Sequence, residues 1–338
     1  MSSMLLQKIL RRIITIVPVI VLAMTVVFFV SHMVPSDPAR LIAGQYASEE
    51  QVAQIRAEYG LDKPLPTQYL IYLRDTFTGR FGKSMHTRRP VMEDIEEFFP
   101  ATMELALVSM FIVIVVGVPL GVVSAVRKDH LSDHASRLFA LGGVSVPVFW
   151  LAILMQLYFY FKLGWLPVGD RLTYGLAPPT DITGLYILDS LLTGNWQTLG
   201  DSIRHIILPA AALSISSMSS VVRQTRSEML KVLKEDYVVF HKAYGLARWR
   251  VIYKYALRNA LTPTVSLVGL VFGLLLGGSF LVETVFNWPG IGQYVAQSVL
   301  SSDFPAIIGA TMVVTLSYAL VNLLVDVVYM LINPKVRL

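Results

Sequence analysis

The sequence of 338 residues contains no cysteine and few charged residues. The absence of cysteine excludes disulfides, thiolate zinc sites, cysteine-held iron–sulfur clusters and a cysteine nucleophile. Asp, Glu, Lys and Arg make up 15% of the chain, against about 25% in a soluble domain. Because hydrophobic residues make up 54%, the composition predicts an integral membrane protein.

Charged residues are absent from six long stretches. A helix needs about 20 apolar residues to cross the hydrocarbon core of a membrane. Five uncharged runs reach this length: Ile13–Val34, Leu105–Val126, Leu138–Phe161, Asn259–Val282 and Phe304–Val325. A sixth, Ile206–Val222, is shorter and rich in serine. We therefore predict an all-α fold with six transmembrane helices. The first run is too long for a signal peptide and lacks a small-residue cleavage site, so we expect it to be retained.

The loops between these runs alternate in charge. Four segments carry a combined net charge of +12: the N-terminal tail, 127–137, 223–258 and the C-terminal tail. The alternate loops, 35–100, 162–205 and 283–303, carry −5. Basic loops remain in the cytoplasm, so we predict that both termini are cytoplasmic. The net charge of the chain, +5, is then explained by its basic cytoplasmic loops, and no nucleic-acid partner is expected.

The outer loop 35–100 is long enough to have its own structure. Ser48 and Gln51 form a capping box ahead of a helix that Gly60 ends. A second helix is predicted over Pro66–Phe77. This helical extracytoplasmic module either meets another protein or only covers helix ends. The domain organisation is then 1–34 (tail and first helix), the module, and a five-helix core over 101–338.

The inner loop 223–262 has two open interpretations. A basic amphipathic stretch can lie on anionic lipid. However, Gly245 interrupts the stretch, with one helix expected to start near Glu235 and another near Arg248. A glycine between two helices makes an elbow whose exposed flank can dock on a soluble partner.

Motifs in nearly the whole chain resemble the B-type permease subunits of dipeptide, oligopeptide and nickel ABC importers. They are Pro35-Ser36-Asp37-Pro38, Gly60–Pro64, Gln68-Tyr69, Gly82, Ser84, Pro100–Leu105, Gly117–Val122, Asp236-Tyr237-Val238, Gly245-Leu246, Leu257–Ala260, Pro263, Glu283–Phe286, Trp288–Gly292 and Asn333-Pro334.

The resemblance implies that Glu235–Pro263 is a coupling segment that sits in a cleft of an ATPase subunit. The coupling residues are then Glu235, Asp236, Tyr237, His241, Ala243, Gly245 and Leu246. The sequence departs from the family pattern at His241, where a small residue is usual, and at Gly79-Arg80, where glycine-aspartate is usual. We interpret His241 as a surface histidine and not as a metal ligand.

The resemblance also implies a function: a pore-forming subunit of an ATP-binding-cassette importer for di- or oligopeptides in the bacterial inner membrane. Nickel chelates, glutathione and oligosaccharides are alternative solutes. The implied partners are a C-type permease, an extracytoplasmic solute-binding protein, membrane lipid and two ATPase subunits that bind ATP and magnesium. This chain itself is expected to be no enzyme and to hold no metal or cofactor.

Two other classes of protein remain as alternatives. An ion-coupled secondary transporter would show internal repeats and broken helices with charge at the midplane. An intramembrane enzyme would need a set of catalytic residues that the sequence does not offer. His130 and His134 share a short segment with Asp129 and Asp133, which we interpret as a solvated turn.

Some polar residues lie inside the predicted spans or directly at their ends. Glu104 precedes the run Leu105–Val126 and Asp326 follows the run Phe304–Val325. Both are costly within a membrane helix unless paired, and their positions away from the span centres favour structural pairing over a functional role. Ser216, Ser217 and Ser220 either line a translocation path or allow close helix packing.

The charge difference between loops predicts the topology directly. Reporter fusions after residues 80 and 185 should report the outside, and fusions after residue 240 and at the C-terminus should report the cytoplasm. A cytoplasmic signal from the fusion after residue 80 would contradict the predicted orientation.

Overall fold

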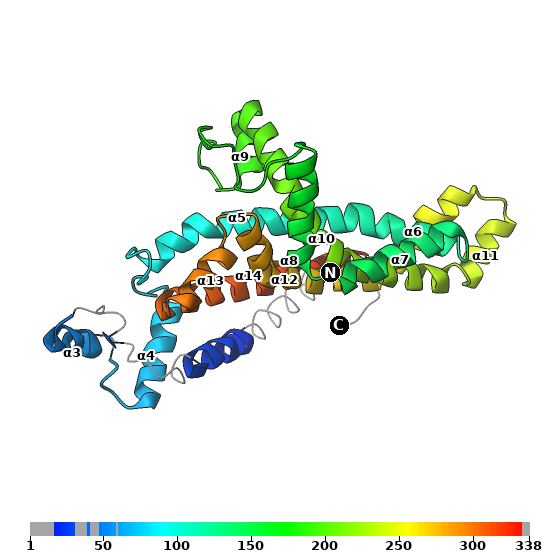
Figure 1. Ribbon diagram of the computed structural model, residues 1–338. Coiled ribbons are helices and arrows are strands. Elements are labelled where there is room, and N and C mark those ends of the chain that lie inside the picture. Colours follow the sequence, from blue (N-terminus) through cyan, green and yellow to red (C-terminus); the bar gives the residue numbers. More distant parts are fainter. Residues whose placement is uncertain (1–16, 31–38, 41–46, 59, 333–338) are drawn as a thin grey trace. The chain divides into compact units, whose positions relative to one another are not determined.

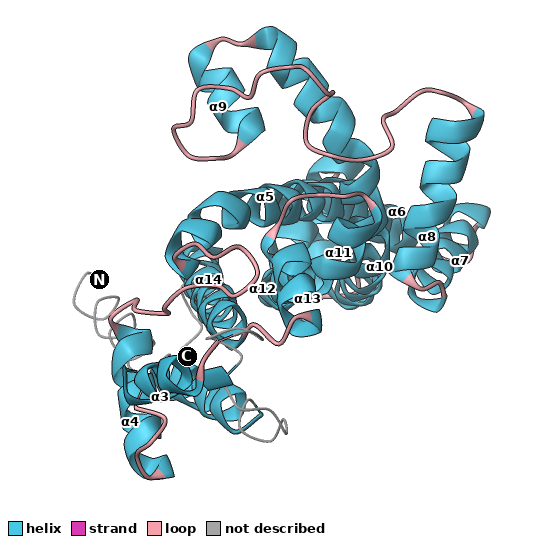
Figure 2. Cartoon of the chain, turned by 60° about the vertical axis from the view of Figure 1, so that its left-hand side comes forward, coloured by secondary structure: helices cyan, strands magenta, loops and turns pink. Residues whose placement is uncertain are grey.

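The computed structural model describes residues 17–30, 39–40, 47–58 and 60–332 (Figure 1). Within these residues the chain is helical, and the only strand-like pairing is an isolated bridge between Lys83 and Pro90 (Figure 2). The chain divides into two compact units. Unit 1 comprises Met1–Phe99 with Gln293–Ala319, and unit 2 comprises Pro100–Gly292 with Leu320–Leu338.

The helices keep the labels of Figure 1, where α denotes α-helix and η a π-helical segment. Their bounds are α3 Glu49–Glu58, α4 Leu65–Phe77, α5 Val91–Ile112, η1 Val113–Gly117, α6 Val118–Val126, α7 Leu131–Ser145, α8 Val148–Met155, η2 Gln156–Lys162, α9 Tyr186–Thr193, α10 Trp196–Val232, α11 Asp236–Ala243, η3 Arg250–Ala256, α12 Leu257–Val285, α13 Ile291–Leu300 and α14 Phe304–Ile332.

Among the residues that the structure describes, four helices are long and apolar enough to cross a membrane: Val91–Val126, Trp196–Val232, Arg250–Gly277 and Phe304–Val328. Helix α7 and the following helix Val148–Lys162, which consists of α8 and η2, are bent against each other. If these two helices together form one span, the number of candidate spans is five. The first predicted span, Ile13–Val34, lies partly outside the described residues, and its described part is the shorter apolar helix Val17–Val30. The all-α membrane fold is confirmed, while the number of six spans stays a prediction.

The prediction of one continuous helix over Leu138–Phe161 is wrong. The chain bends by 106° between Ser145 and Val148. Proline disfavours the α conformation of the residue before it. Val146 accordingly has φ −98° and ψ 125°, and Pro147 has φ −58° and ψ 132°. The apolar run therefore forms two helices.

The two helices predicted in the outer loop are confirmed in unit 1. The Ser48 amide donates to Gln51 Oε1 at 2.9 Å, and the Gln51 amide donates to Ser48 Oγ at 3.3 Å. The chain leaves α3 through Gly60, whose φ is +66°. Helix α4 begins at Leu65, one residue before its predicted start.

A second part of unit 1 is organised by one buried carboxylate. Asp303, just before α14, accepts hydrogen bonds from Ser84 Oγ at 2.6 Å and from the His86 amide at 3.1 Å. It also caps α14 by accepting from the Ala306 amide at 3.3 Å. The residue Ser84 of the family motif thus has a structural role.

Unit 2 is built around the long helix α10, which contacts α6, α7, α8, α9 and α12. Glycines allow two of these helices to approach closely. A Cβ at Gly121 would lie 2.6 Å from Thr225 Cβ, and one at Gly143 would lie 2.7 Å from Ser219 Oγ. Small residues at such contacts are typical of helix packing in membranes.

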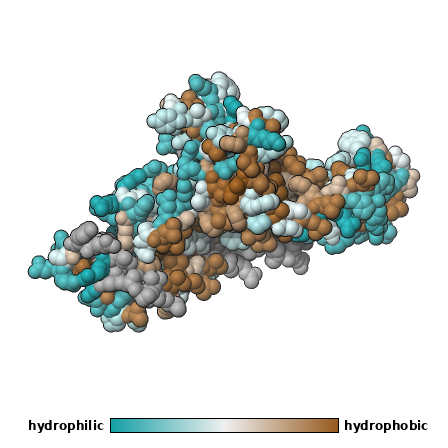
Figure 3. Space-filling view, in the orientation of Figure 1, coloured by the Kyte–Doolittle hydropathy of each residue, from teal (hydrophilic) through white to brown (hydrophobic). Residues whose placement is uncertain are grey.

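Apolar side chains gather on the middle of unit 2. Figure 3 shows that hydrophobic residues cover the part of unit 2 between α9 and α11. Polar residues dominate at the two ends, around α9 and around α11. Helix α8 and the segment η2 expose the large apolar side chains Phe149, Trp150, Ile153 and Leu157. This distribution is the one expected of a helix bundle surrounded by lipid.

Near α9, Glu104 forms an ion pair with Arg171. Arg171 Nη2 donates to Glu104 Oε2 at 2.6 Å, and the side chains are 7% and 5% exposed. The guanidinium also lies 3.5 Å from the centre of the Tyr186 ring, and Glu104 Oε1 accepts from the Ile187 amide at 2.7 Å. The expected structural pairing of Glu104 is confirmed. Asp326 is half-buried on α14.

The loop before α9 is held by a second carboxylate, Asp189. Although burial raises the pKa of this group, hydrogen bonds from Thr183, the Ile182 amide and the Gly184 amide hold the pKa below its ordinary value. The carboxylate is therefore charged at neutral pH and fixes the loop that contains Gly184. The carbonyl oxygen of Gly184 in turn accepts a hydrogen bond from Arg171 Nη2.

We expect Arg171→Met to lower the stability of the protein by about 3–5 kcal/mol, because it leaves Glu104 buried without its cation. Thermal unfolding of the purified protein in detergent measures the change. Glu104→Gln added to Arg171→Met should recover part of the loss, since it removes the unpaired charge. Arg204→Met, at an exposed arginine, is the control. A loss as large in the control would mean that the ion pair has no special role.

Candidate functional site

The inner loop of unit 2 forms an elbow from residues 235–263. Helix α11 starts at Asp236, and a second helix starts at Arg248, as predicted. This second helix is not short, because it continues through η3 into α12. The elbow is therefore continuous with the membrane-spanning helix Arg250–Gly277.

The turn of the elbow depends on Gly245. Its φ is +74°, a left-handed conformation that glycine adopts without steric cost. The Leu246 amide donates to His241 O at 3.2 Å, and the Gly245 amide donates to Lys242 O at 3.1 Å. These two bonds are those of a Schellman motif, which satisfies the last carbonyls of α11.

The inner face of the elbow packs on the ends of two other helices. Val238 of α11 and Val251 of η3 are 0% and 1% exposed. They lie in one apolar cluster with Val122 of α6 and Met229 of α10. A change in the position of the elbow therefore acts on α6, α10 and α12 together.

Aromatic contacts fix α11 against the second helix. The ring of His241 lies on that of Tyr255 with 4.1 Å between centroids. Asn259 Nδ2 donates to the Tyr237 hydroxyl at 2.7 Å. His241 is half-buried in this stack, so one face of its ring is packed while the residue remains at the surface of the elbow.

The outer face of the elbow exposes large apolar side chains. Val239, Phe240, Tyr244 and Trp249 are 53%, 55%, 75% and 60% exposed. Their aromatic character in a basic loop is a signal that the sequence analysis missed. Exposed patches of this kind mark surfaces that bind other molecules.

The predicted coupling residues have different positions in the elbow. Glu235, Asp236, Ala243 and Gly245 are exposed, whereas Tyr237, His241 and Leu246 are half-buried. A Cβ added at Gly245 would meet no atom within 4 Å. The space around the turn is therefore open to a partner.

The interpretation of the segment around His130 and His134 as a solvated turn is wrong for Asp133. Its carboxylate is buried and accepts from Arg226 Nε and Nη2, both at 2.8 Å, and from Ser124 Oγ at 2.5 Å. The ion pair joins the start of α7 to α10 close to the elbow. His130 and His134 are exposed, and the described residues contain no cluster of three metal-binding side chains.

The serines of α10 fall into two groups. Ser219 is buried where Gly143 of α7 comes close, so it serves helix packing. Ser216, Ser217 and Ser220 are half-buried. Their role in a translocation path stays a prediction.

The apolar spans, with an exposed elbow continuous with one of them, define a membrane protein. Two family models match this chain. "Binding-protein-dependent transport system inner membrane component" matches residues 117–338, and "Binding-prot-dependent transport system membrane comp, N-term" matches residues 5–106. The chain belongs to this family of inner-membrane transport components.

Curated relatives are similar over nearly the whole chain. The Probable D,D-dipeptide transport system permease protein DdpB of Escherichia coli K12 is 45% identical over 311 residues, 92% of each chain. The Dipeptide transport system permease protein DppB of Alkalihalophilus pseudofirmus is 40% identical over 97% of this chain and 98% of its own. The Glutathione transport system permease protein GsiC of Salmonella choleraesuis is 37% identical over 98% and 99%.

The stacking of His241 on Tyr255 leads to a test of the elbow's rigidity. We expect His241→Ala to increase, by about two- to twelvefold, the population in which α11 is detached from the apolar cluster beneath it. The reason is that an aromatic pair contributes about 0.5–1.5 kcal/mol. The chain has no native cysteine, so Val238→Cys provides a single buried thiol whose labelling rate measures opening. His241→Phe retains a ring and should label at the parent rate. Equal rates for His241→Ala and His241→Phe would exclude a role for the stack.

Proposed function

We propose that this chain is a pore-forming permease subunit of an ATP-binding-cassette importer that moves di- or oligopeptides across the bacterial inner membrane. The observation that carries the proposal is the elbow, which exposes an aromatic surface and continues directly into a membrane-spanning helix. The peptide substrate is supported by relatives that are 37–45% identical and are named as dipeptide or di/tripeptide permeases.

The proposed topology has six spans with both termini in the cytoplasm. It is supported by the charge difference between alternate loops and by the apolar helices of the described residues. The helical module of residues 35–100 then lies outside the cytoplasm, where it can meet a solute-binding protein. The elbow lies on the cytoplasmic side, where ATP is available.

The elbow is the proposed contact for a cytoplasmic ATPase subunit. This chain does not hydrolyse ATP in the proposal: two partner subunits bind ATP and magnesium. Phe240, Tyr244 and Trp249 supply apolar contact area, and the open space at Gly245 admits the partner surface. Because the second helix of the elbow is continuous with α12, a displacement of the docked elbow moves a membrane helix.

The transmitted movement reaches more than one helix. The apolar cluster under Val238 and Val251 includes residues of α6 and α10, and the Asp133–Arg226 ion pair adds the start of α7. Rocking of these helices against those of a C-type permease opens and closes the path in the proposed cycle. Ser216, Ser217 and Ser220 on α10 are the proposed polar lining.

A second candidate substrate is glutathione, a peptide-like thiol, which is supported by the glutathione permease at 37% identity. Nickel chelates and oligosaccharides have no such support among the relatives reported above. An ion-coupled secondary transporter is disfavoured because the chain belongs to a family defined by binding-protein-dependent transport.

The proposed coupling role predicts the effect of Gly245→Val. A β-branched residue at φ +74° strains the turn and fills the open space. Strain of about 1–3 kcal/mol lowers the population of the docking-competent elbow by about 5- to 150-fold. Uptake and co-purification of ATPase subunits should fall, while the amount of the protein in the membrane stays unchanged.

Two further variants separate strain from docking. Gly194→Val is a matched control, since Gly194 has φ +69° and equally open surroundings but lies between α9 and α10. It should retain the ATPase subunits. Gly245→Asn should keep more activity than Gly245→Val, because asparagine tolerates positive φ. Normal uptake with full ATPase recovery in Gly245→Val would overturn the coupling role.

A further inference from the structure

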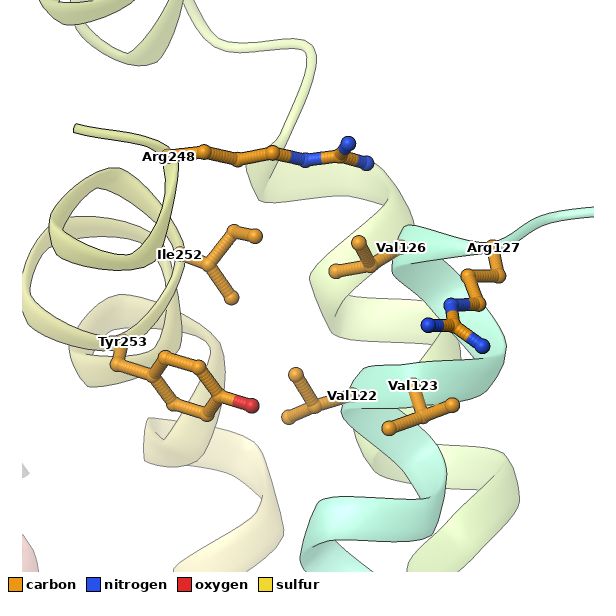
Figure 4. A pocket seen from close by; sticks show the side chains of 7 residues that line it. All are labelled: Val122, Val123, Val126, Arg127, Arg248, Ile252 and Tyr253. Carbon is orange, nitrogen blue, oxygen red and sulfur yellow. The ribbon is translucent and has the colours of Figure 1, made fainter. Parts of the chain in front are cut away.

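A groove lies at the base of the elbow, within unit 2. It has a volume of about 350 Å³ and is lined by Val122, Val123, Val126, Arg127, Arg248, Ile252 and Tyr253. Figure 4 shows one wall formed by Arg248, Ile252 and Tyr253 and the other by the end of α6 with Arg127. We call it the inner groove.

The inner groove combines an apolar floor with two cations. Val122 and Ile252 are 1% and 9% exposed, so they form a firm apolar surface. Arg127 and Arg248 are both exposed. In the described part of the chain, no carboxylate forms an ion pair with either guanidinium. The groove therefore offers two uncompensated positive charges beside apolar surface.

The apolar residues of the groove lie inside two candidate spans, and the two arginines lie just beyond the ends of these spans. Val122, Val123 and Val126 lie in the span Val91–Val126, and Ile252 and Tyr253 lie in the span Arg250–Gly277. Arg127 follows the first span directly, and Arg248 precedes the second by two residues. Both guanidinium groups thus belong at the membrane surface, while the groove floor reaches into the apolar layer.

We propose that the inner groove is a binding site for one anionic phospholipid, whose phosphate lies between Arg127 and Arg248 and whose acyl chain follows the valines of α6. Guanidinium groups bind phosphate through several parallel hydrogen bonds. Basic pockets between helices on the cytoplasmic side bind acidic lipid headgroups. The Tyr253 hydroxyl, which points into the groove in Figure 4, is placed to donate to a lipid oxygen.

This chemistry favours a lipid over a soluble partner. A soluble acidic segment would pair with the arginines but would have to enter the apolar layer to cover Val122 and Val123. An acyl chain occupies that layer already. The site joins η3 of the elbow to the end of α6, so a bound lipid stabilises the elbow in its place. The inference uses the cytoplasmic position of the elbow but is independent of the transported solute.

Native mass spectrometry of the complete transporter, purified in mild detergent, tests the site. The probes are 1-palmitoyl-2-oleoyl-phosphatidylglycerol and the matching phosphatidylcholine. We expect preferential retention of phosphatidylglycerol and about 30-fold weaker retention in Arg127→Gln/Arg248→Gln, from the loss of two basic contacts at the surface. Arg137→Gln/Arg223→Gln removes the same charge at two exposed arginines outside the groove and should leave retention unchanged.

Two further arms test the apolar part. Val126→Trp fills the groove without changing its charge and should weaken retention about tenfold, by excluding acyl methylene groups. Inorganic phosphate should not displace the bound lipid, because it has no acyl chain. Displacement by phosphate at low concentration would reduce the groove to a simple anion site and overturn the proposal.

The remaining outcomes are also decisive. Equal weakening in the two double variants would show nonspecific attraction of lipid to the basic surface. Loss of ATPase subunits from Arg127→Gln/Arg248→Gln with unchanged lipid retention would identify the groove as a protein-docking surface. Either result overturns the proposal. Neither depends on the outcome for Gly245→Val, which tests coupling by transport.

Discussion

The conformation of the elbow depends on the burial of its inner face against α6 and α10. A helix as short as α11, with eight residues, is not stable alone in water. Its stability has to come from the apolar surface under Val238 and from the stack of His241 on Tyr255. The same contacts leave the opposite face free, so the exposed Phe240 and Tyr244 result from how α11 is held. The shape of the elbow and the exposure of its aromatic face therefore have a common physical origin.

Buried ion pairs are placed at both ends of unit 2, where the membrane helices meet loops. The Glu104–Arg171 pair fixes the segment around α9, and the Asp133–Arg226 pair fixes the start of α7. A charge near the end of a span costs less than one at its centre, and an ion-pair partner offsets part of the remaining cost. In the Asp133–Arg226 pair this partner is bidentate. These pairs give fixed geometry to loops that apolar packing alone would leave loosely defined.

The middle of unit 2 uses a different device. Gly121 and Gly143 bring α6 and α7 close to α10, so that the helices are held by dispersion contacts between backbones and small side chains. Lipid-facing residues such as Phe149 and Trp150 need no protein partner there. The helices packed closely on α10 thus form the bundle against which the elbow packs at one end.

The sequence alone determined the features that depend on neighbouring residues. The uncharged runs marked four helices that the structure contains, and the capping box at Ser48 and the turn at Gly245 were placed correctly. These features follow from local hydrogen bonds, from steric limits on φ and from the length of apolar runs. The bend at Pro147 was also a local signal, but it was hidden by the continuous hydrophobicity around it.

Only the tertiary structure decided which distant residues meet. Glu104 pairs with Arg171, Asp133 with Arg226 and His241 with Tyr255. The inner groove likewise needs residues 122–127 beside residues 248–253. A lone acid or arginine in a sequence has many partners of similar chemistry. The packing of helices on α10 selects the actual partner, because it decides which side chains are buried next to each other. A charge buried there without a partner would be costly.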